Sequence, residues 1–195
     1  FEKSLASYQQ RQGTPGAGGE EQADLWTDFQ RHLRFLREEG FVDETNRLTE
    51  NGAWASKLRL DQPLLIAEGI RKGVFPRGDE KLLAAIIAPF VYDGDQEVTL
   101  IRTELPSRLV RSYDRVVKAL AELLERLKAG GFPVAPLFLW PAAVIYDWAM
   151  GGDWNWIIRK TGIADGDLAM LIMRTADNLR QIGSLKETHP ETAAL

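Results

Sequence analysis

Five side chains near the C-terminal end of the chain could contact a ligand together. Met170, Arg174, Asp177 and Gln181 follow one another at intervals of 4, 3 and 4 residues, which places them along one side of a helix, and Met173 borders them. A guanidinium can stack on a nucleobase or bridge a phosphate, and a primary amide can hydrogen-bond a base edge. A thioether can pack against a base but cannot pair with a phosphate. The opposite side of this helix carries the residues expected to face the core, namely Leu168, Leu171, Ile172, Thr175, Leu179 and Ile182.

The sequence offers little for catalysis or metal binding. Cysteine is absent, which excludes disulfides, thiolate metal sites and a cysteine nucleophile, and the two histidines, His32 and His189, have no metal-ligand spacing. Gly13 and Gly18 are spaced as in a phosphate loop, but the next two residues are Gly and Glu, where such a loop needs Lys and then Ser or Thr. No other ATPase motif is present, so we expect the chain alone to be unable to hydrolyse ATP.

The acidic and aromatic residues have ordinary structural explanations. Asp165 and Asp167 stand where a helix begins, and capping of that helix explains them better than catalysis does. Trp154 and Trp156 lie in a polar stretch, where burial and an exposed stacking surface are equally good explanations. The remaining tryptophans fall on apolar helix faces and are expected in the core: Trp26, Trp54, Trp140 and Trp148.

Composition and charge describe an ordinary globular protein. The 195 residues are 45% hydrophobic and 27% charged, and no stretch is long and apolar enough for a membrane span. The sequence opens without a signal peptide, so a cytoplasmic location without membrane contact is expected. The formal net charge of −4 argues against strong independent binding of nucleic acid, because phosphate binding depends on clustered Lys and Arg. A few contacts within a larger channel are compatible with that charge.

The first part of the chain combines a connector, a long helix and a short hairpin. Residues 1–23 are expected to form a flexible linker, because they contain a stretch dominated by Gly and polar residues. Apolar residues recur at helical spacing over 24–39, and a polar turn lies in the middle of 41–49, which predicts a helix followed by a β-hairpin. Thr49 is expected to cap the next helix. Residues 24–60 are therefore interpreted as a winged-helix-like remnant with a connector helix.

The rest of the chain is predicted to be helical, with a domain at 61–189 and a tail at 190–195. The expected helices span 64–72, 79–91, 107–129, 137–150 and 165–182. The apolar run at 82–91 is nearly continuous, so that helix should be buried on all sides. The longest helix has a basic side, which carries Arg108, Arg111, Arg115 and Lys118. Exposure to solvent and contact with nucleic acid explain this basic side equally well. The sequence thus predicts a mainly α fold, a helical bundle with a winged-helix-like remnant and a β-hairpin near its N-terminus.

Three passages between residues 36 and 185 carry a resemblance to a known family through their order and spacing. The first contains Gly40-Phe41-Val42, Leu48-Thr49, Gly52 and Trp54-Ala55, and the second Gly73-Val74-Phe75 and the run from Ala84 to Val91. The third contains Trp148-Ala149-Met150-Gly151, Thr161-Gly162, Asp165-Gly166-Asp167-Leu168 and Leu179-Arg180-Gln181-Ile182. Together they resemble the DSHCT domain, the C-terminal region of superkiller-like DEAD/DEAH-box helicases of superfamily 2.

The resemblance implies a ratchet-type accessory domain of an ATP-dependent helicase. In that family the last helix lies beside the channel behind the motor domains, so Met170, Met173, Arg174, Asp177 and Gln181 are implied to contact single-stranded RNA or DNA. The implied partners are that strand and the motor domains of the same protein, which bind ATP and Mg²⁺, whereas this chain itself holds no cofactor. The family's helix is usually rich in arginine where this chain has Met170 and Met173.

Two other functions are compatible with the residues. A helical module for protein–protein interaction, without direct nucleic-acid contact, is the principal alternative, and salt-insensitive binding to a protein would distinguish it from a strand-binding domain. A winged-helix transcription regulator is a weaker alternative, because the arginines of the helix at 24–39 are offset by acidic residues of the same helix.

Overall fold

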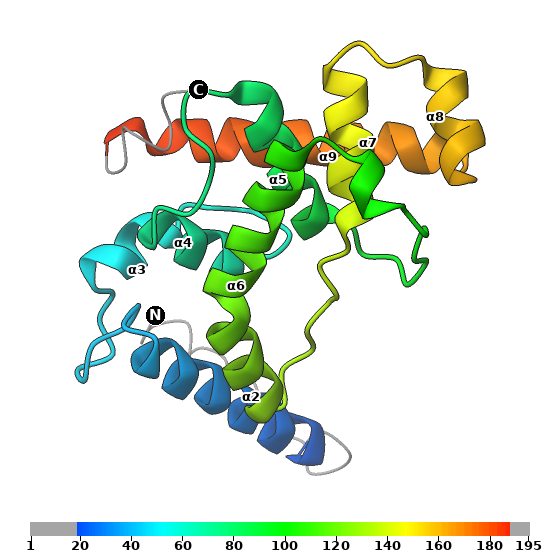
Figure 1. The fold of residues 1–195 in the computed structure, drawn as a ribbon. Helices are drawn as coiled ribbons and strands as arrows, with labels where there is room; N and C mark the ends of the chain where they lie inside the picture. The colour runs from blue at the N-terminus through cyan, green and yellow to red at the C-terminus, as the bar shows by residue number, and fades with distance from the viewer. Residues whose placement is uncertain (1–18, 188–195) are drawn as a thin grey trace. The chain divides into compact units, whose positions relative to one another are not determined.

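The described part of the chain is made of helices (Figure 1). The computed structural model describes residues 19–187, with side chains from 25 to 185. Along the chain the helices are α2 (Gly19–Glu38), α3 (Glu50–Ala55), α4 (Pro63–Arg71), α5 (Glu80–Val91), α6 (Ser107–Ala129), α7 (Leu139–Ala149), α8 (Trp154–Thr161) and α9 (Asp165–Gly183). Two short 3₁₀ helices, η1 (Arg102–Glu104) and η2 (Ser184–Glu187), complete the elements of this range. The predicted mainly α fold is confirmed.

The chain divides into two compact units, Phe1–Gly52 and Ala53–Leu195. The division falls inside α3, earlier than the predicted end of the connector helix. In the first unit α2 begins at Gly19, so the last residues of the predicted linker are helical. Residues 1–18 and 188–195, which include His189 and the predicted tail, lie outside the described residues.

The predicted hairpin of the first unit is reduced to a single pairing. Val42 and Leu48 form an isolated antiparallel bridge, and no longer strand occurs within residues 19–187. The expected cap of the next helix is confirmed, because the Gly52 amide donates to Thr49 Oγ1 at 3.1 Å. The relation of this unit to a winged helix stays a prediction.

The loop between the bridged residues is organised by Asp43. Its Oδ1 accepts hydrogen bonds from the backbone N–H of Arg47 at 2.9 Å and from the backbone N–H of Thr45 at 2.8 Å. The Thr45 hydroxyl donates to the same oxygen at 2.8 Å. These bonds, chiefly that from Arg47, stabilise the carboxylate and hold the pKa of Asp43 below its ordinary value.

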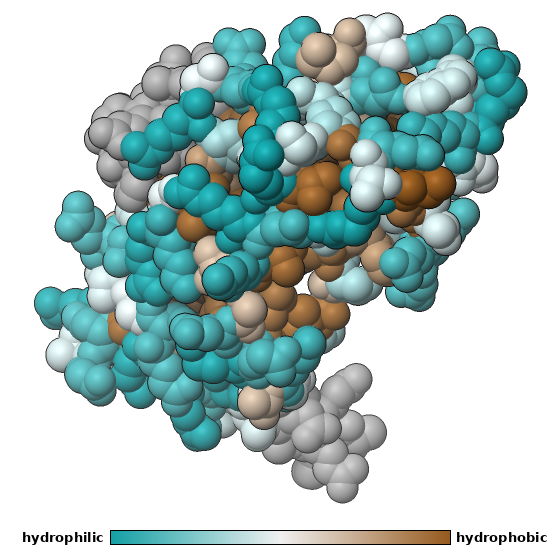
Figure 2. Space-filling view, in the orientation of Figure 1, coloured by the Kyte–Doolittle hydropathy of each residue, from teal (hydrophilic) through white to brown (hydrophobic). Residues whose placement is uncertain are grey.

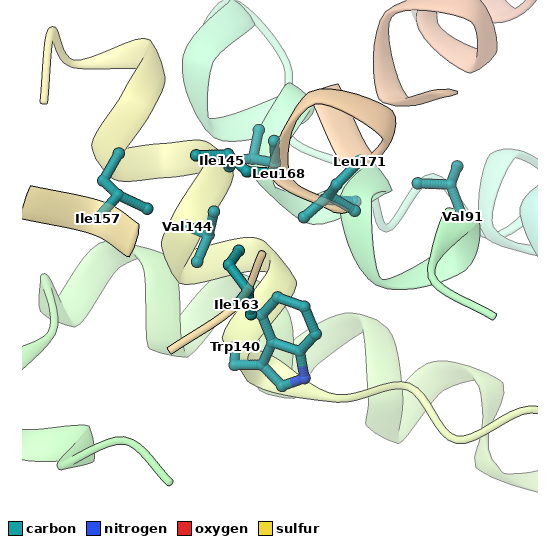
Figure 3. Close-up of a cluster of buried hydrophobic side chains, with 9 residues drawn as sticks. Val91, Trp140, Val144, Ile145, Ile157, Ile163, Leu168 and Leu171 are labelled. Atoms are coloured by element: carbon teal, nitrogen blue, oxygen red, sulfur yellow. The ribbon is translucent and has the colours of Figure 1, made fainter. Parts of the chain in front are cut away.

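In the second unit, α5 packs chiefly against α7 and α9. Figure 3 shows the cluster of buried side chains, drawn from these helices, α8 and the segment before α9, that forms this part of the core. Its labelled members are Val91, Trp140, Val144, Ile145, Ile157, Ile163, Leu168 and Leu171. The predicted burial of α5 on all sides is confirmed, since every residue from Ala85 to Val91 is buried. Each fully buried Leu or Ile contributes about 1.5–3 kcal/mol, so α9 is fixed firmly to α5 and α7.

Of the four tryptophans predicted to lie in the core, two are buried and two are exposed. Trp54 and Trp140 are each 2% exposed, as predicted, and the indole N–H of Trp140 donates to the Gln96 carbonyl at 3.0 Å. Trp26 and Trp148 were expected in the core as well, but they are 49% and 42% exposed. A helix has a wide apolar face, and only the central part of that face reaches the core in either helix. Within residues 19–187, no helix combines the length and the apolarity needed to cross a membrane.

Candidate nucleic-acid interface

The candidate site lies on α9, which is anchored along one side. Leu168, Leu171, Thr175, Asn178 and Ile182 are buried, at intervals of 3, 4, 3 and 4 residues. Four of the six predicted core-facing residues are therefore confirmed, whereas Ile172 and Leu179 are only half-buried and Asn178, which was not predicted, is buried. This side of the helix packs on α5. Side chains on the other sides of α9 are consequently held by a rigid element.

Met170 and Met173 carry the large apolar side chains of the predicted site, and both side chains are exposed. Met170 is 53% exposed and Met173 is 63% exposed. Asp177 is also exposed and forms a salt bridge with Arg180, one turn further along α9. A pair of this kind on a helix surface contributes little to stability. The outward side of α9 therefore presents thioethers beside an exposed, internally neutralised ion pair.

Arg174 does not face solvent freely but joins α9 to two other segments. Its Nη2 lies 2.5 Å from Asp61 Oδ1 and its Nη1 lies 2.8 Å from Asp93 Oδ2. The arginine side chain is 26% exposed, that of Asp61 31% and that of Asp93 79%. Burial by itself lowers the pKa of Arg174, but hydrogen bonds to the two carboxylates outweigh it and raise the pKa above the ordinary value. The guanidinium is thus permanently charged and largely satisfied within the chain.

Asn178 is a member of this arrangement that sequence reasoning missed. Its Nδ2 donates to Asp61 Oδ2 at 2.9 Å and to the Arg174 carbonyl at 2.9 Å. The side chain is only 4% exposed, and its Oδ1 has no hydrogen-bond partner among the described residues. The only signal in the sequence was the 3–4 spacing of Asn178 with Leu171, Thr175 and Ile182, which continues the buried side of the helix.

Gln181 is occupied in a similar way. Its Nε2 donates to the Arg59 carbonyl at 3.0 Å, and its Oε1 accepts from the Arg59 backbone N–H at 2.9 Å. The amide therefore pairs with a backbone peptide, which fixes its orientation and uses one of its two N–H donors and one acceptor site of its oxygen. The structure thus separates the five predicted residues: Met170, Met173 and Asp177 point outward, while Arg174 and Gln181 fasten α9 to residues 59–61.

The predicted capping of α9 by acidic residues is wrong. The residue before the first turn is Ala164, which has no side-chain bond to the helix, and Asp165 and Asp167 are already helical. Asp165 instead accepts a hydrogen bond from the indole N–H of Trp154 at 2.7 Å. The indole donor competes with the backbone N–H groups for that carboxylate. The acidic residues still lie in the first turn, where they favourably oppose the positive end of the helix dipole.

A second feature of this unit is an apolar pocket of about 370 Å³ between α6, α7 and α8. Its lining includes Leu105, Met150, Trp156 and Lys160. Trp156 is 43% exposed, and the Lys160 ammonium lies over its ring at 4.5 Å from the centroid. Trp154 is half-buried, so Trp154 and Trp156, for which the sequence did not decide between burial and exposure, lie in different environments. Among residues 19–187, no group of acidic or histidine side chains is clustered closely enough to hold a metal ion.

Comparison with known proteins extends this description to the level of a family. Residues 45–194 match the family model of the DSHCT (NUC185) domain. The chain is also similar to the protein named mRNA transport homolog 4 of Caenorhabditis elegans, with 24% identity over 162 residues. That match covers 80% of this chain but 15% of the nematode protein. The similarity thus concerns one region of a much longer protein.

Proposed function

The chain belongs to the DSHCT (NUC185) domain family, and we propose that it is the accessory domain of an ATP-dependent helicase. In this proposal the domain braces the motor domains of the same protein and guides single-stranded RNA or DNA along α9. ATP and Mg²⁺ bind in the motor domains, so the chain contributes position and contact rather than chemistry. The name of the nematode relative refers to mRNA transport, which favours RNA as the strand. The cytoplasmic location stays a prediction.

The observation that carries the proposal is the pairing of a rigid helix with exposed thioethers. Met170 and Met173 are 53% and 63% exposed on a helix whose opposite side is buried. A motor must hold a strand without reading its sequence, and any base offers a π-face for packing. Thioethers pack on such faces through polarisable sulfur. Contacts of this type depend little on salt, because no counterion is released when they form.

A phosphate that approaches Arg174 competes with two internal carboxylates for its positive charge. Asp93 is the weaker of the two, because its side chain is 79% exposed whereas that of Asp61 is 31% exposed. We therefore expect Asp93→Ala to increase strand affinity several-fold, since it removes the acceptor of Arg174 Nη1 without removing Asp61. Fluorescence anisotropy with a labelled oligonucleotide measures this change. An unchanged affinity would show that Arg174 takes no part in strand binding and acts only inside the fold.

The methionines themselves provide the direct test. The chain contains three methionines, so labelling of the ε-methyl groups with ¹³C gives a simple spectrum for the intact chain. Titration with a 20-nucleotide single strand should shift the Met170 and Met173 signals. Met150 is 55% exposed but lies at the end of α7, so it serves as the internal control. Single Met→Leu variants assign the three signals.

The outcomes separate the proposal from its alternatives. Shifts confined to Met170 and Met173 support a strand along α9, and Met170→Ala together with Met173→Ala should then weaken binding by roughly tenfold, as loss of a stacked or packed base does. Equal shifts of all three signals indicate non-specific contact and contradict the guiding role. Absence of any shift at strand concentrations that saturate the motor-containing protein contradicts it as well.

A module for protein–protein interaction is the second candidate, and the apolar pocket favours it. Figure 2 shows hydrophobic patches among the hydrophilic side chains of the face in view, and exposed Trp156 and Met150 line the pocket of about 370 Å³. In this function the Met150 signal shifts on addition of the purified motor domains, independently of salt, while a single strand leaves Met170 and Met173 unmoved. That pair of results would favour the second candidate over the first.

A further inference from the structure

An open groove of about 760 Å³ lies in the second unit between the end of α4 and the middle of α6. Its lining is Lys72, Val74, Arg111, Asp114, Arg115, Lys118, Ala119 and Glu122. None of these residues belongs to the α9 site. The basic side of α6, for which the sequence left a solvated surface and a nucleic-acid contact equally open, contributes Arg111, Arg115 and Lys118 to one wall of the groove, and Lys72 extends the same charge to the other wall.

The groove carries an excess of positive charge that is not cancelled locally. Lys72, Arg111, Arg115 and Lys118 contribute cations, and Asp114 and Glu122 contribute carboxylates. Asp114 is already paired, because both of its oxygens accept from Nη2 of Arg102, at 2.6 and 2.8 Å. The remaining carboxylate is Glu122. This local excess contrasts with the net charge of −4 for the whole chain.

Two of the cations are fixed by backbone carbonyls. Lys72 Nζ donates to the Ala119 carbonyl at 2.7 Å, and Arg115 Nη2 donates to the Gly73 carbonyl at 3.2 Å. These bonds orient the side chains across the groove but leave the charge of Arg115 unneutralised. Lys72 also lies 3.4 Å from Glu68 Oε1, but the other oxygen of that carboxylate is 2.5 Å from Arg71, so Glu68 is shared between two cations.

The other two cations are free to meet a ligand. Arg111 and Lys118 are exposed, and neither has an ion-pair partner among residues 19–187. With Arg115 they follow intervals of 4 and 3 residues along α6, so they lie on the same side of the helix. A rise of 1.5 Å per residue places them about 6 Å and about 4.5 Å apart along the axis. Such a row can contact successive charges of an extended polyanion.

We propose that this groove binds the sugar–phosphate backbone of single-stranded nucleic acid, as a second contact separate from α9. The inference rests on the proposed function and adds the part that α9 lacks, because Arg174 is occupied by Asp61 and Asp93. Phosphate is favoured over an acidic polypeptide because a nucleic-acid strand carries a charge at every nucleotide, so successive phosphates can meet the row of cations in any register.

The test compares two double variants of the intact chain with equal loss of charge. Arg111→Gln with Lys118→Gln removes the free cations of the groove, and Arg159→Gln with Lys81→Gln removes one exposed Arg and one exposed Lys that line neither the groove nor the apolar pocket. Binding of a fluorescent 20-nucleotide single strand is followed by anisotropy between low and moderate salt. The groove variant should lower affinity at low salt by roughly 3- to 30-fold. It should also make the slope of log K against log salt shallower by about 1.4, the value for two lost phosphate contacts on a single strand.

Three results would overturn the inference. First, an equal loss of affinity in the control variant would mean that total charge and not the groove controls binding. Second, an unchanged slope of log K against log salt in the groove variant would show that Arg111 and Lys118 make no phosphate contact. Third, if polyglutamate displaced the strand as effectively as an unlabelled oligonucleotide of equal charge does, the groove would be assigned to acidic polypeptides.

The same experiment distinguishes failure of this inference from failure of the proposed function. If the wild-type chain binds the strand and shifts the Met170 and Met173 signals, but the groove variant binds with an unchanged slope, only the groove is refuted. If the wild-type chain neither binds nor shifts these signals, both proposals fail. Unchanged methyl spectra of the free variants confirm that the fold is intact.

Discussion

The two acidic partners of Arg174 should differ sharply in their contribution to stability. Asp61→Ala removes the acceptor of one charge-assisted bond from Arg174 and of one bond from the buried amide of Asn178. Asp93→Ala removes a single bond from the same guanidinium. The two substitutions change charge and size identically, so each is the natural control for the other.

The expected magnitudes follow from exposure and bond number. A hydrogen bond to a charged group contributes about 1.5–3 kcal/mol and a neutral one about 0.5–1.5 kcal/mol. Because the Asp61 side chain is 31% exposed, solvent screening reduces the first value, and we expect Asp61→Ala to cost about 2–3 kcal/mol in total. The Asp93 side chain is 79% exposed, so Asp93→Ala should cost less than about 1 kcal/mol, as exposed pairs do.

Thermal unfolding followed by circular dichroism measures both substitutions in the intact chain. At roughly 2–4 °C per kcal/mol for a protein of this size, Asp61→Ala should lower Tm by about 4–12 °C and Asp93→Ala by less than about 4 °C. The ¹³C-methyl signal of Met173 reports whether α9 itself becomes mobile in either variant. Equal losses of Tm in the two variants would refute the reasoning, because they would show that burial of Asp61 and its bond to Asn178 do not matter.

Two further predictions concern the first unit. The pKa of Asp43 lies below its ordinary value because the Arg47 and Thr45 groups bond to its carboxylate, so its stabilising effect is complete above about pH 3.9 and is lost as the pH falls through the lowered pKa. The protection of the Thr45 and Arg47 amides, measured relative to an unstructured peptide at the same pH, should therefore fall only on acidification below that value, and a loss of protection near pH 6 would contradict the assignment. Gly52→Ala should destabilise this unit by about 1–3 kcal/mol, since its new Cβ would meet the Phe41 carbonyl oxygen at 1.9 Å, and an unchanged urea midpoint would show that the backbone yields freely.

The helices could be predicted from the sequence where local periodicity and local stop signals agree. The apolar run of α5 and the regular apolar spacing of α6 each define an element without reference to the rest of the chain. Gly162, with φ of 70°, ends α8 in the left-handed conformation, yet α8 itself was not predicted. It contains only eight residues, and its one buried side chain, Ile157, gives no periodic pattern to recognise.

The side-chain partners within the candidate site could not be predicted in the same way. Asn178 is buried because Asp61 accepts from it across 117 residues of sequence, and Gln181 pairs with Arg59 across 122. A helical wheel gives the direction of each side chain on α9 but not the identity of what it meets. The wheel therefore placed Arg174 and Gln181 with the outward methionines, although a neighbouring segment covers that flank of the helix.

This distribution of charge bears on how a strand could be held. The cations of α9 itself are neutralised, Arg174 by Asp61 and Asp93 and Arg180 by Asp177, so a phosphate there competes with internal carboxylates. On α6, by contrast, Arg111 and Lys118 have no such partner among the described residues. Packing of bases on methionine leaves a strand free to slide, since it reads no sequence, whereas phosphate contacts add affinity that salt can reduce. If both proposals hold, base packing and backbone attraction are assigned to different helices, and each can be weakened without the other.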